Sequence, residues 1–188
     1  EMNDINRIVT LINEAKDCGI NVQPPDINIS FSDFRALLDG SISFGLSAIK
    51  NVGSKATESI VEYREEHNLY KKIFDVCKID SGTVNRKALE SLIQAGACDN
   101  LEGHRSQQFE IIDSAIKFGQ KIIQDAKSNQ QSLFANADKA SSPIIIEPKL
   151  PMIEEWTKKD ALKREKEMLG FYLSGNPLDD YAHDINEL

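Results

Sequence analysis

The chain has 188 residues, of which 40% are hydrophobic and 28% are charged, with a formal net charge of −8. This balance is typical of a globular protein with one domain or two small ones, and no apolar run is long enough to span a bilayer. The three cysteines are far apart and odd in number, which argues against a disulfide framework or a zinc site. Strong nucleic-acid binders usually carry a basic surplus, so any DNA contact here is expected to be local and weak.

The N-terminal part is expected to contain two helices joined by an extended link. Apolar residues recur at helical spacing over residues 5–15, and a glycine ends the run. Pro24 and Pro25 then favour extended backbone, because proline restricts both itself and the residue before it. Ser30 and Asp33 have the spacing of a capping box, which predicts a second, short helix with phenylalanines and leucines on its apolar side.

The rest of the chain is expected to be helical on either side of a linker. A pattern of helix, tight turn and helix covers residues 44–64, and amphipathic helices are predicted at 84–94 and 105–126. Residues 127–152 have the polar, proline-containing composition of an exposed linker. A charged helix that ends at a glycine follows over residues 155–169.

The tight turn has features that suit a phosphate group. In Asn51, Val52 and Gly53, two residues that tolerate positive φ flank an apolar residue that can enter the core. The turn leads into a helix start, whose free amide groups and dipole attract a phosphate oxygen. Lys50 and Lys55 add positive charge at the same place. An ordinary helical corner with a glycine stop explains these residues equally well.

This stretch resembles the helix-hairpin-helix motif, which binds the DNA backbone without reading bases. The predicted DNA-binding residues are Lys50, Asn51, Val52, Gly53, Ser54 and Lys55. A second, degenerate corner at residues 92–97 is expected to belong to the core rather than to contact DNA. The predicted fold class is mainly α: a helical, bundle-like domain with a tandem helix-hairpin-helix unit and an extended proline-containing linker.

Longer blocks of the chain resemble the alpha subunit of bacterial DNA polymerase III, the replicative polymerase of the C family. The blocks are residues 19–30, 42–53, 85–97 and 169–178. They follow the family's order and together cover nearly the whole chain. Asn51 and Asn176 stand where the family usually has glycine and histidine. The chain begins with Glu1 rather than with a start methionine, which favours an internal piece of such a polymerase.

The resemblance implies a division of the chain. Residues 1–40 would end the fingers domain, and residues 41–104 would form the helix-hairpin-helix DNA-binding unit. Residues 105–188 would hold a long helix, a clamp-binding linker peptide and a C-terminal helical part. The parent protein would be a cytoplasmic DNA-directed DNA polymerase whose palm, with its metal-binding aspartates and magnesium, lies upstream. We therefore expect no catalytic residue, no metal site and no cofactor in this chain.

The predicted linker contains one apolar pair, Leu133 and Phe134, with no local core to join. Together with the resemblance, Gln130, Ser132, Leu133 and Phe134 look like the bacterial sliding-clamp motif: a glutamine, two variable positions, then leucine and phenylalanine. Leu133 and Phe134 would fill an apolar pocket on the clamp, each contributing about 1.5–3 kcal/mol of burial. Gln130 would hydrogen-bond at the rim. A helix end that packs back onto residues 105–126 is the alternative.

The predicted function is therefore the part of the replicative polymerase that contacts duplex DNA non-specifically and tethers the enzyme to the sliding clamp, its beta subunit. Other subunits of the polymerase III holoenzyme are expected partners, and a membrane is not. Two alternatives stay open. One is an error-prone paralogue of the same subunit. The other is a stand-alone helix-hairpin-helix module, which would explain residues 44–64 but neither the block at 22–30 nor the clamp peptide.

Overall fold

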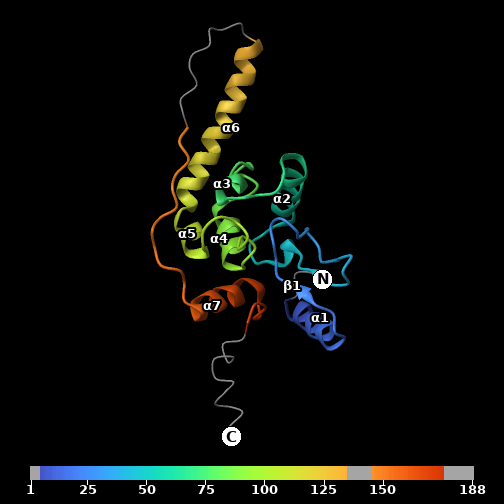
Figure 1. The fold of residues 1–188 in the computed structure, drawn as a ribbon. Coiled ribbons are helices and arrows are strands. Elements are labelled where there is room, and N and C mark those ends of the chain that lie inside the picture. Colours follow the sequence, from blue (N-terminus) through green and yellow to red (C-terminus); the bar gives the residue numbers. More distant parts are fainter. Residues whose placement is uncertain (1–4, 135–144, 176–188) are drawn as a thin grey trace.

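The computed structural model describes residues 5–134 and 145–175 of the chain, and its fold is mainly α, as predicted (Figure 1). Its helices are α1 (Ile5–Asp17), the 3-10 turn η1 (Leu46–Ala48), α2 (Ser54–His67), α3 (Ile73–Val76), α4 (Arg86–Gln94), α5 (Arg105–Glu110), α6 (Ile112–Phe134) and α7 (Lys158–Leu169). Within these described parts of the chain, no helix is long and apolar enough to cross a membrane.

The N-terminal helix α1 packs on a small sheet, which the sequence did not predict. The strands are β1 (Val22–Gln23), β2 (Arg35–Ala36) and β3 (Ile42–Ser43). They lie in the order β1-β3-β2, with β1 parallel and β2 antiparallel to β3. Ile8 and Ile12 of α1 are buried, as the helical spacing predicts, and α1 contacts β1.

The short helix predicted after Ser30 is wrong. The Ser30 hydroxyl is buried and accepts a hydrogen bond from the Asp26 amide at 3.1 Å, so it does not cap a helix. The following segment instead runs beside the chain after Gly45: the Leu46 amide donates to the Phe31 carbonyl at 2.8 Å. A Cβ at Gly45 would lie 2.7 Å from the Phe34 amide nitrogen, so only glycine permits this close approach. Long-range pairing here overrides the local helix signal.

The core is centred on α4, which packs against α5, α6 and α7. Leu89, Leu92 and Ile93 of α4 are completely buried, because the helix presents its apolar positions at helical spacing. The same cluster of buried side chains extends from Ile8 in α1 to Leu169 in α7. The domain boundaries at residues 40 and 104 stay a prediction, and the buried core continues across both of them.

The long helix predicted at residues 105–126 is two helices, and the second one is longer than expected. The first helix, α5, ends at Glu110 with Ile111 as its C-cap residue, and the second, α6, runs from Ile112 to Phe134. Residues 127–134 lack glycine and proline, and glutamine is a good helix former, so nothing in the local sequence stops the helix. The start of α6 packs on α3, and its far end projects from the body of the molecule (Figure 1). The linker composition predicted from residue 127 therefore misplaced the helix end.

Residues 145–157 form an extended strap that returns from the α6 side to α7 (Figure 1). None of its residues is fully buried, as expected of a linker, but the strap is also bound to the body by specific contacts. Lys72 pairs with Glu147 at 2.7 Å, and the Gln107 side chain donates to the Pro151 carbonyl at 2.8 Å. The helix predicted at 155–169 is α7, which ends at Gly170 in the left-handed conformation, as the glycine indicated.

Candidate nucleic-acid interface

The hairpin turn joins η1 to α2 in the manner the sequence predicted. The Val52 amide donates to the Ile49 carbonyl at 3.1 Å, which closes a tight turn. Asn51 has φ of +66°, a conformation that asparagine adopts more readily than most residues. Val52 is only 4% exposed and joins the hydrophobic core. The turn is therefore anchored by its apolar residue, while Asn51 and Gly53 on either side of it are exposed.

Two helices from distant parts of the sequence hold the turn in place. The Asn51 side-chain amide donates to the Ser91 hydroxyl of α4 at 3.1 Å. The Lys50 backbone amide donates to the Met168 carbonyl, near the C-terminal end of α7, at 3.0 Å. Because both bonds fix backbone or short side chains, the turn is preorganised before any ligand arrives. Ser91 and Met168 are structural residues of this site that the sequence alone did not indicate.

The start of α2 is open to solvent. Gly53 is its N-cap residue, and no side chain caps the helix. The amides of Ala56 and Thr57 both donate to the Gly53 carbonyl, at 3.0 and 3.1 Å. The amides of Gly53, Ser54 and Lys55 form no hydrogen bond with the residues that the structure describes, and all three residues are exposed. Free amides at the positive end of a helix dipole suit an oxygen anion.

Gly53 does not use the positive φ that both residues flanking Val52 tolerate. Its φ is −79° and its ψ is 158°, so its backbone is extended. A Cβ at Gly53 would meet no atom within 4 Å. Neither backbone strain nor internal packing therefore explains a glycine here. The open space beside Gly53 leaves its backbone accessible to an external group.

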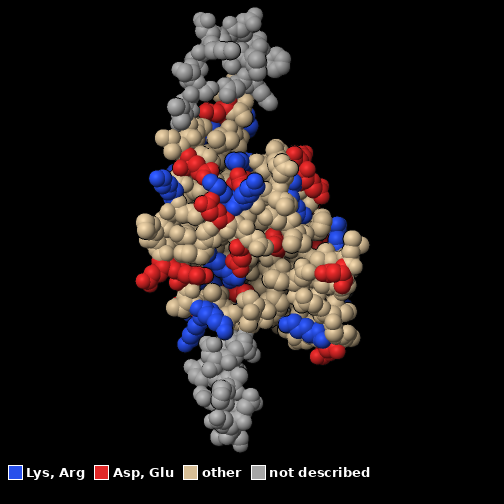
Figure 2. Space-filling view, in the orientation of Figure 1, with Lys and Arg blue, Asp and Glu red and all other residues tan. Residues whose placement is uncertain are grey.

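The hairpin carries positive charge on a chain whose net charge is negative. Lys50 and Lys55 are exposed beside the open helix start. Figure 2 shows acidic and basic side chains interspersed over the visible face of the molecule, consistent with the net charge of −8. Two lysines and the positive end of a helix dipole would attract an anion to the hairpin against the negative net charge of the chain.

The second corner, after α4, belongs to the core. Ala95, Ala97 and Cys98 are buried, and Gly96 has φ of +84°. The Arg105 guanidinium fills the space where a Cβ of Gly96 would lie. This corner therefore presents no open backbone and belongs to the core, as predicted.

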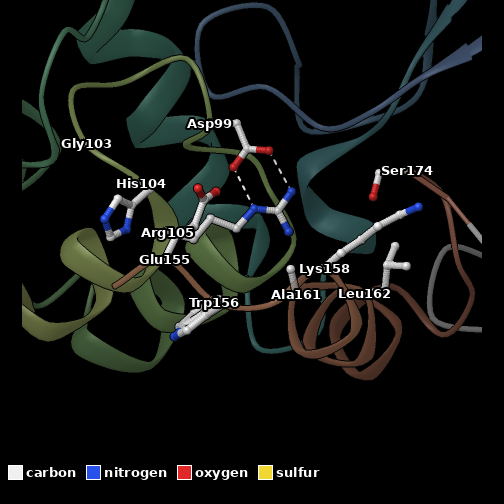
Figure 3. Close-up of a pocket in the computed structure, with 10 residues that line it drawn as sticks. All are labelled: Asp99, Gly103, His104, Arg105, Glu155, Trp156, Lys158, Ala161, Leu162 and Ser174. Atoms are coloured by element: carbon white, nitrogen blue, oxygen red, sulfur yellow. Dashed lines mark hydrogen bonds and ion pairs between the residues drawn. The ribbon is translucent and has the colours of Figure 1, made fainter. Parts of the chain in front are cut away.

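A cavity of about 660 Å³ lies between this corner, α5 and the start of α7 (Figure 3). Arg105 crosses it and donates two hydrogen bonds of 2.6 Å to Asp99. Burial alone would lower the pKa of Arg105, but the hydrogen bonds and charge of Asp99, with Glu165 behind them, hold that pKa above its ordinary value. Because Arg105 is committed to these carboxylates, the cavity offers no free guanidinium to an anion.

Metal ligands do not gather in the parts of the chain that the structure describes. No group of three or more histidine, cysteine, aspartate or glutamate side chains there has the geometry to hold a metal ion. Cys77 and Cys98 are buried, and burial raises the pKa of both thiols, to about 12 for Cys77. Their chemistry is that of inert core residues rather than of ligands or nucleophiles.

The predicted clamp-binding residues lie at the end of α6. The helix reaches Phe134, so the backbone of this stretch is helical rather than part of an open linker. The side chains of Gln130, Ser132, Leu133 and Phe134 lie outside the described residues. The structure does not bring this stretch near the hairpin: the hairpin lies in the body, and the end of α6 projects away from it (Figure 1).

The comparisons with known proteins agree with this architecture. A family model described as "Helix-hairpin-helix motif" matches residues 19–108, which contain both corners. The fold and the turn thus define a helix-hairpin-helix protein.

Relatives named "DNA polymerase III subunit alpha" match the chain over nearly its whole length. The relative from Vibrio cholerae is 35% identical over 100% of the chain, that from Borreliella burgdorferi 37% over 99%, and that from Escherichia coli K12 32% over 98%. The chain belongs to the family of bacterial DNA polymerase III alpha subunits, as its sequence blocks indicated. It spans about 16% of the length of these relatives.

Proposed function

We propose that this chain is the part of a bacterial replicative DNA polymerase that holds duplex DNA by its backbone and tethers the enzyme to its sliding clamp. The observation that carries the DNA contact is the open start of α2 behind the Asn51 turn. Membership of the polymerase III alpha family supports the replicative context. A stand-alone helix-hairpin-helix module does not explain why relatives match the chain beyond residues 19–108.

The contact with DNA would work as follows. A phosphate oxygen accepts hydrogen bonds from the free amides of Gly53, Ser54 and Lys55, and the α2 dipole adds attraction. Lys50 and Lys55 neutralise the phosphate charge from either side of the turn. Because these groups reach only the backbone, they position the duplex without reading its sequence. An acidic chain with one such site binds weakly by itself and depends on the rest of the polymerase for affinity.

The hairpin is tested by Gly53→Asp combined with Lys55→Glu, measured by fluorescence anisotropy with a labelled duplex over a range of salt. The hairpin should contribute one or two phosphates, about −1 to −2, to the wild-type salt slope, and the variant should lose that contribution and bind more weakly. Gly53 has no atom near its Cβ position, and aspartate is a good N-cap residue, so the variant should fold and even gain about 0.3 kcal/mol. Lost binding with retained stability separates a contact from a structural role.

The matched control for charge combines Lys121→Glu with Gln124→Glu, at two exposed positions of α6 far along the chain from the hairpin, and changes the net charge by the same three units. It should change binding little compared with the hairpin variant. Equal affinity of the hairpin variant and the wild type at low salt would remove the DNA contact from residues 50–55.

Clamp tethering is supported by the projection of α6. The helix carries residues 130–134 away from the body, where a ring-shaped partner can approach without touching the hairpin (Figure 1). Leu133 and Phe134 supply the apolar anchors, and Gln130 and Ser132 lie beside them in the sequence. A short peptide has modest affinity alone, and attachment to the DNA-bound polymerase raises its effective concentration.

The test is a titration of the cognate clamp by calorimetry. Replacing Leu133 and Phe134 together by alanine should cost roughly 3 kcal/mol or more, about a hundredfold in affinity. The neighbouring change Gln131→Ala is the matched control and should be nearly silent, as should the Gly53 variant. If the double alanine variant binds the clamp as tightly as the wild type does, the tether lies elsewhere.

DNA synthesis itself is assigned to other parts of the polymerase, which would work in the cytoplasm with further holoenzyme subunits. In that arrangement magnesium belongs to the palm and not to this chain. Primer-extension assays with the purified 188-residue chain should show no activity above background. Activity at any reproducible level would contradict this assignment.

A further inference from the structure

Helix α7 carries a row of lysines along one flank. Its inner face is defined by Leu162, Glu165 and Met168, which are buried at a spacing of three residues. The lysines of the flank are Lys159, Lys163 and Lys166. All three are exposed, and their spacing of four and three residues places them on one side of the helix, about a quarter-turn or more from the inner face. Figure 2 shows basic side chains over α7.

The opposite flank of α7 is already occupied. Arg164 lies 4.2 Å from the ring centroid of Trp156 and 5.6 Å from that of Phe109, so this arginine is used to bind the strap and α5. Lys159 and Lys163, in contrast, form no ion pair with the residues that the structure describes. The lysine flank is therefore the side of α7 on which positive charge is presented to solvent.

The C-terminal end of α7 contacts the hairpin. The Met168 carbonyl, in the last turn of α7, accepts the Lys50 amide at 3.0 Å, so the end of α7 touches the turn that begins the proposed DNA contact. Lys166 is the lysine nearest to this end, and its ammonium lies 4.6 Å from the ring centroid of Tyr172. A cation over an aromatic ring keeps its charge and loses part of its freedom, which favours a fixed contact.

We propose that the lysine flank of α7 is a second part of the DNA interface, and that it binds phosphates of the same duplex beyond those held by the hairpin. The inference rests on the proposed DNA contact of residues 50–55. From Lys159 to Lys166 the helix rises about 10 Å. Successive phosphates of one strand advance about 3.4 Å along the duplex axis, so the flank matches about three nucleotide steps.

This arrangement explains how a chain with a net charge of −8 can hold DNA. The lysines of α7 share one flank, and the end of this helix adjoins the hairpin turn through the bond between Lys50 and Met168, while acidic side chains of α7 such as Asp160 and Glu167 lie on its outer face. A duplex that follows the path meets positive charge along several phosphates. The hairpin would then fix the register, and α7 would supply most of the salt-dependent attraction.

The experiment replaces Lys159, Lys163 and Lys166 together by glutamine and measures the affinity for a labelled mixed-sequence duplex as a function of salt. We expect the slope of log affinity against log salt to become less steep by up to about 2.7, which is 0.9 for each of three phosphates. The matched control replaces three exposed lysines of α6, Lys117, Lys121 and Lys127, and changes the net charge by the same amount. Its slope should stay close to that of the wild type.

The outcomes separate this inference from the proposed hairpin contact. If the hairpin variant loses binding while the α7 variant keeps the wild-type slope, the hairpin contact stands and the α7 inference is overturned. Equal losses from the α6 and α7 triple variants would also overturn it, because they would report net charge alone. If the α7 variant loses slope and the hairpin variant binds normally, the flank binds DNA and the hairpin contact fails. Circular dichroism of each variant verifies that α7 is retained.

Discussion

Glu165 is the residue of α7 whose removal we expect to do most damage. Its carboxylate is buried, with the side chain 2% exposed, and it accepts hydrogen bonds from the amides of Leu173 and Ser174 and from the Ser174 hydroxyl, at 2.8, 2.9 and 2.6 Å. Arg105 lies 3.8 Å away. The carboxylate thereby holds residues 170–174 against the body, where the ring centroids of Phe171 and Phe44 lie 6.3 Å apart.

The magnitude follows from these contacts. Hydrogen bonds to a charged group contribute about 1.5–3 kcal/mol each, but they are not additive when the segment they hold can detach. Removing one partner of a buried charge pair costs about 3–5 kcal/mol, because the other charge loses its compensation. Arg105 keeps Asp99 as a second partner. We therefore expect Glu165→Ala to lower the free energy of unfolding by about 3 kcal/mol.

Urea unfolding followed by tryptophan fluorescence measures this change. The single tryptophan, Trp156, packs on Phe109 and Arg164 next to α7, so its emission reports the region concerned. Hydrogen exchange of the Leu173 and Ser174 amides gives the local effect, which should be a loss of protection. Glu167→Ala is the matched control: it removes an exposed glutamate of the same helix and should change stability by less than about 0.5 kcal/mol.

The reasoning is refuted if Glu165→Ala has the wild-type free energy of unfolding and the two amides keep their protection. The Glu165 carboxylate would then contribute nothing to stability, and residues 170–174 would be held by the packing of Phe171 alone. A loss of amide protection without a change in global stability would show instead that the segment opens separately from the core.

Two further predictions concern packing and thiol chemistry. Gly119→Ala should destabilise the protein by about 1–3 kcal/mol in thermal unfolding, because the new Cβ would overlap the Cys77 carbonyl oxygen, although alanine normally stabilises a helix interior. Gln124→Ala on the same helix is the control, and equal melting temperatures of the Gly119 variant and the wild type would contradict the prediction. At mildly alkaline pH a thiol reagent should label exposed Cys18 quickly, and Cys77 and Cys98 only in denaturant, since burial raises the pKa of both; rapid native labelling of all three would disprove it.

The hairpin could be predicted from the sequence because its geometry is set locally. Asn51 adopts the left-handed conformation and Val52 enters the core, as their order in the chain indicates. Gly53 tolerates positive φ as well, but its backbone is extended. Its proposed role depends on the open space around its backbone, which cannot be predicted from the sequence.

The errors have a common cause. Ser30 and Asp33 form a valid capping pattern, yet pairing with the segment after Gly45 takes the backbone away from a helix. The polar residues after Ala126 looked like a linker, yet helix propensity carries α6 on to Phe134. After Ser30, a weak local helix preference lost to hydrogen bonding with backbone that is distant in the sequence. After Ala126, a polar composition that suggested a linker lost to the continuation of a helix that had already formed.

The sequence by itself determined the helical class, the position of the turn, the family and the candidate residues, because these depend on short-range spacing and on blocks of consecutive residues. Only the tertiary structure decided that the end of α7 supports the hairpin through the bond between Lys50 and Met168, and that Glu165 holds residues 170–174. These contacts join positions more than a hundred residues apart or bury a charge inside a charged helix. Their energy comes from packing and desolvation, which depend on three-dimensional neighbours and leave no periodic signal in the chain.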